Sequence, residues 1–189
     1  VMLNESSLIR VSDGRAIPAF NISLSLDTDS WVWSFSASVP AGERQYVEDP
    51  TEALQVVVND EPFVVLPERL TSDRTFGKAV LNVSGRGRQA LLDSPYAAVQ
   101  SFTNASQMTA QQILASVLSV NGVETDTVVT WEPEDWLVPA QAFTHQGSYM
   151  SAINAIAASC GGYVQPHPTD DALSIKLRYP TAPWAWATD

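Results

Sequence analysis

The sequence predicts an α+β protein in which an antiparallel, barrel-like β domain over residues 1–88 precedes a smaller α+β domain over residues 89–189. The first half of the chain alternates apolar and small polar side chains with the period of two that is typical of strands. After Gly85 the apolar residues recur at helical spacing. The chain has 189 residues, which is enough for one or two domains. Because 45% of the residues are hydrophobic and only 16% are charged, we do not expect an intrinsically disordered chain.

A hairpin with an aromatic face is the first predicted element. Residues 22–26 form one strand, and residues 27–30 carry the short polar side chains that bond their own backbone in turns. The return strand, residues 31–39, places Trp31 and Trp33 on one face with further apolar side chains and mainly serines on the other. We expect these tryptophans in the core or in a subunit interface.

A second hairpin and one more strand complete the predicted β domain. Residues 54–58 and 63–66 pair across a turn at residues 59–62, and a further strand covers residues 79–84. Short strands separated by turn signals are typical of a small barrel or sandwich, and closure of a barrel would remove the open sheet edges. Whether this domain closes without later strands stays open at this point.

The first predicted helix begins after Thr109 and ends at Asn121-Gly122. Thr109 and Gln112 have the spacing of a capping box, in which each side chain accepts a hydrogen bond from a free amide at the helix start. Apolar residues from Ala110 to Leu118 lie on one face of this helix. Asparagine and glycine both tolerate the left-handed backbone that ends a helix.

The second predicted helix begins near Ser148 and ends at Gly161-Gly162, with Cys160 on its buried face. Residues 163–165 and 173–179 then form a hairpin, so that two helices pack on a short antiparallel sheet. A tail rich in proline and tryptophan closes the chain.

The segment Gly85-Arg86-Gly87-Arg88 has the composition of a phosphate-binding turn but not its pattern. A dinucleotide fingerprint needs a third glycine three residues after the second, and position 90 is alanine. We therefore expect a structural or inter-subunit role, with Arg86 and Arg88 free to pair with acidic groups of a neighbour.

Three carboxylates, Glu132, Glu134 and Asp135, lie between Trp131 and Trp136. Glycosidases need two carboxyl groups about 5–9.5 Å apart across a cleft. Carboxylates in a single loop that contains proline point in divergent directions. The segment therefore favours an acidic surface loop anchored by its tryptophans over a site for sugar cleavage.

No catalytic, cofactor or metal site is predicted. His145, Cys160, His167 and Asp170-Asp171 are of the residue types that bind zinc, but their spacing matches no compact ligand pattern. Cys160 is the single cysteine, so a disulfide within the chain is excluded, and we expect it to behave as a small hydrophobe. The Gly-x-Ser-x-Gly turn of a serine hydrolase is absent.

Charge and hydropathy limit the expected partners. The formal net charge of −11 argues against binding to duplex DNA, and no sequence-specific nucleic-acid binding is predicted. No apolar run approaches the roughly 18 residues that span a bilayer, and no signal peptide is visible, so no membrane anchor is expected. The chain starts at Val1 and stops just after Trp184-Ala-Trp186, which favours a piece of a longer polypeptide.

Several of these segments resemble the hub proteins of bacteriophage tails. The resemblance rests mainly on residues 65–71, on residues 82–95 with their Gly-Arg-Gly-Arg turn, and on the closing residues 178–186. It implies a split barrel similar to tail-tube subunits, with an α/β domain inserted before the remaining barrel strands. It also implies a virion protein, made in the bacterial cytoplasm, that forms a homotrimeric ring in the baseplate hub or tail tip of a long-tailed phage or prophage. Such a ring joins the tail tube to the central spike or fibre and has no enzymatic activity.

Two other functions remain open. The chain could be a carbohydrate-binding or cell-wall-degrading tail module that uses Trp131, Trp136 and the nearby carboxylates. It could also be the equivalent domain of a contractile secretion spike.

Overall fold

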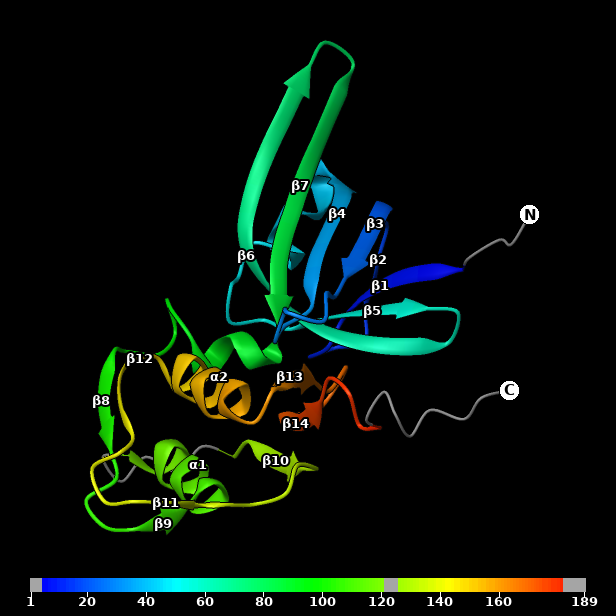
Figure 1. Ribbon diagram of the computed structural model, residues 1–189. Coiled ribbons are helices and arrows are strands. Elements are labelled where there is room, and N and C mark those ends of the chain that lie inside the picture. Colours follow the sequence, from blue (N-terminus) through cyan, green and yellow to red (C-terminus); the bar gives the residue numbers. More distant parts are fainter. Residues whose placement is uncertain (1–4, 121–125, 182–189) are drawn as a thin grey trace, which may run out of the picture. The chain divides into compact units, whose positions relative to one another are not determined.

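The chain divides into two compact units in the computed structural model, which describes residues 5–120 and 126–181 (Figure 1). Unit 1 comprises residues 1–90 together with the short segment 166–170, and unit 2 comprises residues 91–165 and 171–189. None of the helices in the described ranges has the length and apolarity needed to cross a bilayer.

Unit 1 is built on one antiparallel sheet whose strands follow the order β2-β1-β5-β6-β7-β4-β3. Its elements are β1 (Ser6–Arg10), β2 (Ala16–Ile17), β3 (Phe20–Ser25), β4 (Ser34–Pro40), η1 (Ala41–Tyr46), β5 (Leu54–Val58), β6 (Glu61–Thr75), β7 (Lys78–Gly87) and the start of η2 (Arg88–Leu92). The short η helices are of the 3-10 type.

The apolar face of this sheet forms the core of unit 1. Leu8, Leu54, Val65 and Leu81 are almost inaccessible to solvent and come from four different strands. The β3–β4 hairpin predicted from the alternating pattern is confirmed, with Phe35 buried and its serine neighbours turned to the other face. Its second strand begins at Ser34 and not at Trp31.

The β5–β6 hairpin is confirmed with a tighter turn than the sequence suggests. Asn59 and Asp60 both have positive φ, 49° and 68°, and β6 resumes at Glu61. Asparagine and aspartate are the non-glycine residues that tolerate this backbone best, and two such residues match the right-handed twist of the flanking strands.

The sheet has two ends. Within the described residues no ladder joins β2 to β3, so the strands form an open sheet. The predicted antiparallel β architecture is therefore confirmed at the level of the sheet, and closure into a split barrel stays a prediction.

Segment 166–170 belongs to unit 1, where hydrogen bonds from the buried Gln89 and from the backbone hold it. Gln89, only 2% exposed, donates from Nε2 to the carbonyl oxygens of His167 and Asp170, both at 3.1 Å. The amide of Val64 donates to the carbonyl oxygen of Pro168 at 2.8 Å. Burial of polar groups is tolerated when they are bonded in this way.

Unit 2 combines two α-helices with short strands. Its elements are β8 (Gln100–Thr103), β9 (Met108–Thr109), α1 (Ala110–Leu118), β10 (Val128–Trp131), β11 (Leu137–Val138), β12 (Thr144–Gly147), α2 (Tyr149–Ser159), β13 (Gly162–Pro166) and β14 (Ala172–Leu177). The strands form a three-stranded sheet in the order β10-β14-β13 and the two-stranded pairs β11-β9 and β12-β8.

Both predicted helices are confirmed, together with the capping box predicted at the start of the first and the start near Ser148 predicted for the second. Thr109 and Gln112 form the capping box reciprocally, and the Ser148 hydroxyl accepts from the amide of Ser151 at 3.2 Å. Helix α1 ends at Leu118, and the predicted stop at Asn121-Gly122 lies outside the described residues. Helix α2 ends before Cys160, and Gly161 follows with a φ of 70°.

The predicted antiparallel sheet of the second domain is wrong in one respect, because β10 runs parallel to β14. A parallel pair needs a long crossover connection, and here β11, β12, helix α2 and β13 lie between the two strands in the chain. Strand β10 is short, and local alternation carries no information about which distant strand it joins.

Candidate interaction surface

The most exposed part of unit 1 is the outer end of the β6–β7 hairpin. The two strands pair continuously from Thr75↔Lys78 down to a register shift between Pro67 and Arg69. We call residues 69–84, the part beyond this shift, the arm; Figure 1 shows its outer end standing out past the neighbouring strands. Gly77, with a φ of 80°, supplies the left-handed residue in the tight turn at its end.

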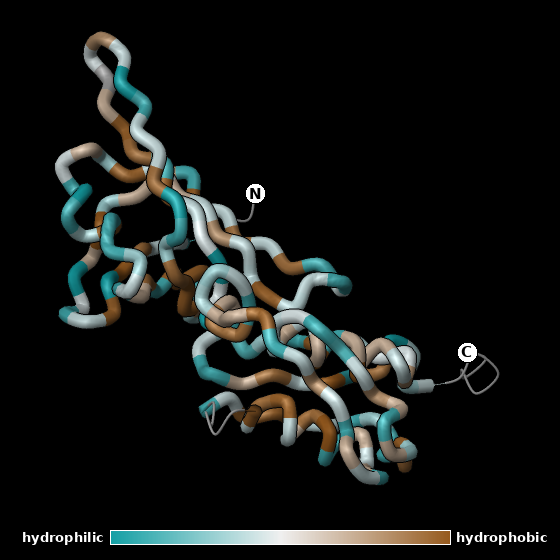
Figure 2. Tube along the Cα trace, turned by 90° about the vertical axis from the view of Figure 1, so that its left-hand side faces the viewer, coloured by the Kyte–Doolittle hydropathy of each residue, from teal (hydrophilic) through white to brown (hydrophobic). Residues whose placement is uncertain are grey.

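The outer end of the arm, residues 71–77, presents its side chains to solvent, whereas Val80, Leu81 and Val83 nearer its base are buried. Every side chain from Thr71 to Thr75 is exposed, and Phe76, at the apex, has a relative exposure of 110%. The end of the hairpin is correspondingly coloured hydrophobic in Figure 2. Large apolar side chains in such positions are typical of interaction sites.

The arm is also basic within an acidic chain. It carries three basic side chains against one acidic, a formal charge of +2, whereas the rest of the chain carries seven basic against 20 acidic, −13. Arg69 and Arg74 are exposed and have no ion-pair partner within the described residues. Exposed unpaired charges of one sign favour a partner of the opposite sign.

The Gly-Arg-Gly-Arg segment lies at the base of the arm and has a structural role. A Cβ on Gly85 would lie 1.8 Å from the backbone oxygen of Leu66, so only glycine lets β6 and β7 approach at this point. The amide of Gly87 donates to the carbonyl oxygen of Trp33 at 2.9 Å. The structural interpretation is therefore confirmed.

Arg86 is satisfied within its own chain, which corrects the expectation that it pairs with a neighbour. Its Nε lies 2.9 and 3.0 Å from the two carboxylate oxygens of Glu68, and its Nη2 lies 2.7 Å from Oε1. The guanidinium also lies 5.9 Å from the ring centroid of Trp31. Cross-strand pairing of this kind fixes the register at the foot of the arm.

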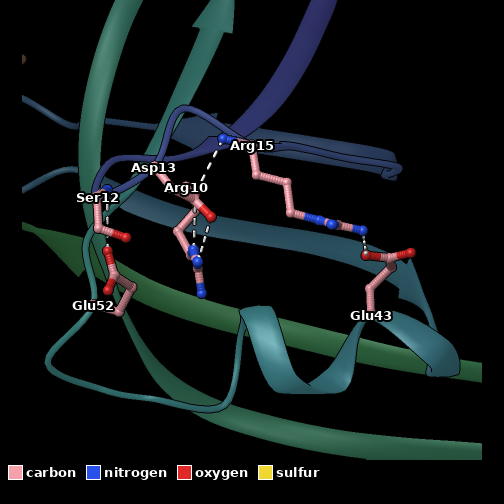
Figure 3. Close-up of polar contacts among 6 residues, drawn as sticks. All are labelled: Arg10, Ser12, Asp13, Arg15, Glu43 and Glu52. Carbon is pink, nitrogen blue, oxygen red and sulfur yellow. Dashed lines mark hydrogen bonds and ion pairs between the residues drawn. The ribbon is translucent and has the colours of Figure 1, made fainter.

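A second polar cluster covers the β1–β2 turn (Figure 3). Arg10 Nε donates to the Asp13 carboxylate at 3.0 Å, and the amide of Arg15 donates to the same carboxylate at 3.1 Å. Arg15 also reaches Glu43 at 3.5 Å and lies 3.8 Å above the Tyr46 ring. The hydrogen bond from Arg10 is the main reason that the pKa of Asp13 falls to about 2.

The face of the sheet opposite the core is polar and shallowly hollowed. A hollow of about 410 Å³ lies over β3, β4, β6 and β7, and serine, threonine and asparagine side chains and Arg69 contribute to its lining. None of its described lining residues is a carboxylate or an imidazole, so this hollow offers no general acid–base pair.

The loop from Trp131 to Trp136 is an exposed acidic loop, as predicted. The two indole rings lie 5.9 Å apart and are half-buried, while the three carboxylates are exposed. Glu132 lies 3.5 Å from Lys176, and Asp135 accepts hydrogen bonds from the amides of Gln111 and Trp136. Asp135 therefore supports the start of helix α1.

The residues considered as zinc ligands are not brought together. Among the described residues, no three histidine, cysteine, aspartate or glutamate side chains converge as a metal site would require. His145 bonds the Ser151 hydroxyl at 2.8 Å, and His167 Nδ1 accepts from the amide of Asp170 at 3.0 Å. Cys160 is half-buried and not on the buried face of α2, because it is the C-cap residue, where its thiol donates to the Ala157 carbonyl.

The tryptophans of the first hairpin are half-buried and not fully in the core. Trp33 packs edge-on against Phe63 with ring centroids 4.9 Å apart, and Trp31 contacts Arg86 as described above. Trp184 and Trp186 lie outside the described residues.

No protein-family model matches the sequence, and no curated protein matches it either. Solved structures share its fold. A tail protein from Neisseria meningitidis MC58 superposes with a TM-score of 0.64 at 16% identity, over 91% of this chain and 51% of that one. The 43 kDa tail protein of prophage MuSo2 from Shewanella oneidensis gives 0.59 at 13% identity, over 92% and 53%.

A third structure comes from a secretion system. An E. coli component of the type VI secretion system, described as similar to the T4 tail proteins gp27 and gp5, gives a TM-score of 0.57 at 10% identity, over 89% of this chain and 48% of that one. The chain thus spans about half the length of these structures. The resemblance to phage tail proteins that the sequence suggests is confirmed at the level of the fold.

Proposed function

We propose that the protein is a structural component of a phage tail tip or baseplate hub, present in the virion and without enzymatic activity. In this role copies of the chain form a homotrimeric ring that joins the tail tube to the central spike or fibre. The observation that carries the proposal is the shared fold, which extends over about nine-tenths of this chain in two tail proteins from different bacteria.

The surface of the chain supports a structural role. The described residues offer exposed strands, an extended arm and a polar sheet face, and the candidate ligand and acid–base residues are dispersed. Two of the three carboxylates in the acidic loop are engaged, Glu132 with Lys176 and Asp135 with the start of α1. A sugar-cleaving site would need two such groups facing each other across a cleft.

The proposal is tested by the mass of the protein in solution and by its partners. Light scattering on the protein is expected to give three times the 20.5 kDa of this chain, or three times the full-length mass if the chain is a piece. A monomer at all concentrations, with no binding to a phage tail-tube protein, would contradict the proposed ring.

The two other functions give different results in the same experiments. Binding to the tube protein of a secretion apparatus, and not to that of a phage tail, would place the protein in a secretion spike. A carbohydrate-binding module would bind cell-wall glycans, and replacement of Trp131 and Trp136 by alanine would abolish that binding. The hub proposal predicts that this double variant still assembles.

A further inference from the structure

We propose that the arm, residues 69–84, is the contact by which one copy of this chain holds the next, through docking of its basic, Phe76-tipped end on the acidic surface of a second copy. The inference rests on the proposed ring and names the element that builds it.

The outer part of the arm, residues 73–79, lacks support within its own chain, whereas residues 80–84 of β7 pair with β4. Strand β4 pairs with β7 only as far as Pro40↔Val80, and β5 pairs with β6 only up to Leu54↔Val65. Beyond these points the described residues of the arm have only each other as strand partners. An isolated two-stranded ribbon is marginally stable in water, and exposed strand edges are ready to pair with another chain.

The apex of the arm has nothing to contact in its own unit. Phe76 is the most exposed large hydrophobic residue of the described chain. Charged residues commonly protect exposed strand edges, but a phenylalanine at the apex does the opposite, because it adds apolar area that only a partner removes from water.

The charge distribution indicates what kind of surface receives the arm. The arm has a formal charge of +2, and the remainder of the same chain has −13. Arg69 and Arg74 are exposed without ion-pair partners, so they are available to a neighbour. A second copy of this chain therefore supplies the complementary surface without any other protein.

Such a contact joins two different surfaces, the arm of one copy and the acidic body of the next. Contacts of this head-to-tail kind generate closed rings when the rotation between copies closes. An isologous two-fold contact would instead dock both arms reciprocally, each on the body of the other copy, and would end at a dimer.

The test compares arm variants with matched variants elsewhere on unit 1. Phe76→Ser removes the apex and Arg74→Glu reverses one free charge. Phe20→Ser and Arg44→Glu make the same changes outside the arm, at an exposed phenylalanine and at an exposed arginine that pairs with Glu48. Self-association of the full-length protein is measured by analytical ultracentrifugation over a concentration series, with circular dichroism as the check on folding.

We expect each arm variant to raise the dissociation constant for self-association roughly 10- to 100-fold, the range that corresponds to exposing one large apolar side chain or losing one well-placed charge contact. The control variants should change it less than about threefold. Association should also weaken between 0.1 and 1 M NaCl, since the Debye length falls from about 10 to 3 Å.

The outcomes separate this inference from the proposed function. A wild-type trimer that arm variants leave intact would overturn the role of the arm and leave the ring standing. Arm variants that trimerise normally but lose binding to another tail protein would also overturn it, because the arm would then face a different partner. A wild-type protein that never associates would contradict both.

Discussion

Replacement of Gly85 by alanine should disrupt the foot of the arm. The added Cβ would lie 1.8 Å from the backbone oxygen of Leu66, 2.9 Å from its carbonyl carbon and 3.1 Å from the Cα of Pro67. Ordinary van der Waals contact begins at 3.4 Å, so the two strands would have to part by about 1.6 Å. All three atoms belong to backbone that is fixed in the β6–β7 ladder, so no side chain can rotate away.

The expected change in the free energy of unfolding of Gly85→Ala is the balance of destabilising and stabilising contributions. Overpacking of this kind typically costs 1–3 kcal/mol or more, and weakening the adjacent ladder hydrogen bonds adds about 1 kcal/mol each. Alanine recovers only about 0.4–1 kcal/mol by restricting the unfolded chain. We therefore expect a net loss of about 3 kcal/mol, which corresponds to a fall in Tm of about 6–12 °C for a chain of this size.

Calorimetry measures this loss, and Gly42→Ala is the matched control. A Cβ on Gly42 meets nothing within 4 Å, so this variant should be neutral or more stable by up to about 1 kcal/mol. A Gly85→Ala protein within about 0.5 kcal/mol of wild type would refute the steric reasoning and reopen the question of why glycine stands there.

Two further predictions concern the polar contacts of unit 1. Because the pKa of Asp13 is lowered from 3.8 to about 2, its ionised form stabilises the fold above the unfolded value, and this contribution disappears as the pH falls through about 2. Asp13→Asn should therefore lower the free energy of unfolding in urea at pH 7 and make no difference near pH 2; a difference independent of pH would contradict the role of the Arg10 hydrogen bond. Gln89→Leu should destabilise the protein by about 1–3 kcal/mol, because the carbonyls of His167 and Asp170 lose their buried donor. Hydrogen exchange should show faster exchange of the Val64 amide in this variant, and unchanged protection there would mean that Gln89 does not hold segment 166–170.

Local sequence patterns were sufficient to predict those features that depend only on residues close together in the chain. The capping box of Thr109 and Gln112, the cap at Ser148 and the alternation in β4 each depend on residues a few positions apart, and each is present. The same holds for the exposed acidic loop, because several charged side chains close together in one short loop favour exposure to water.

The outer strands of the arm carry no strand signal in the sequence, because the alternation of apolar and polar residues that predicts a strand requires one buried face. Residues 71–75 are exposed on both faces, so β6 beyond Leu66 shows no apolar alternation. The local signal for this hairpin was the pair Phe76-Gly77 between the two strand segments, because Gly77 suits a tight turn.

Sequence by itself thus determined the α+β class, the helix starts and the hairpins, because these follow from periodicity and capping over short distances. The tertiary structure alone decided the pairing of Arg86 with Glu68, the parallel placement of β10 beside β14, and the role of Gly85. Each of these depends on which distant strands become neighbours and in what register, and register is set by the burial of the whole sheet, not by any one segment.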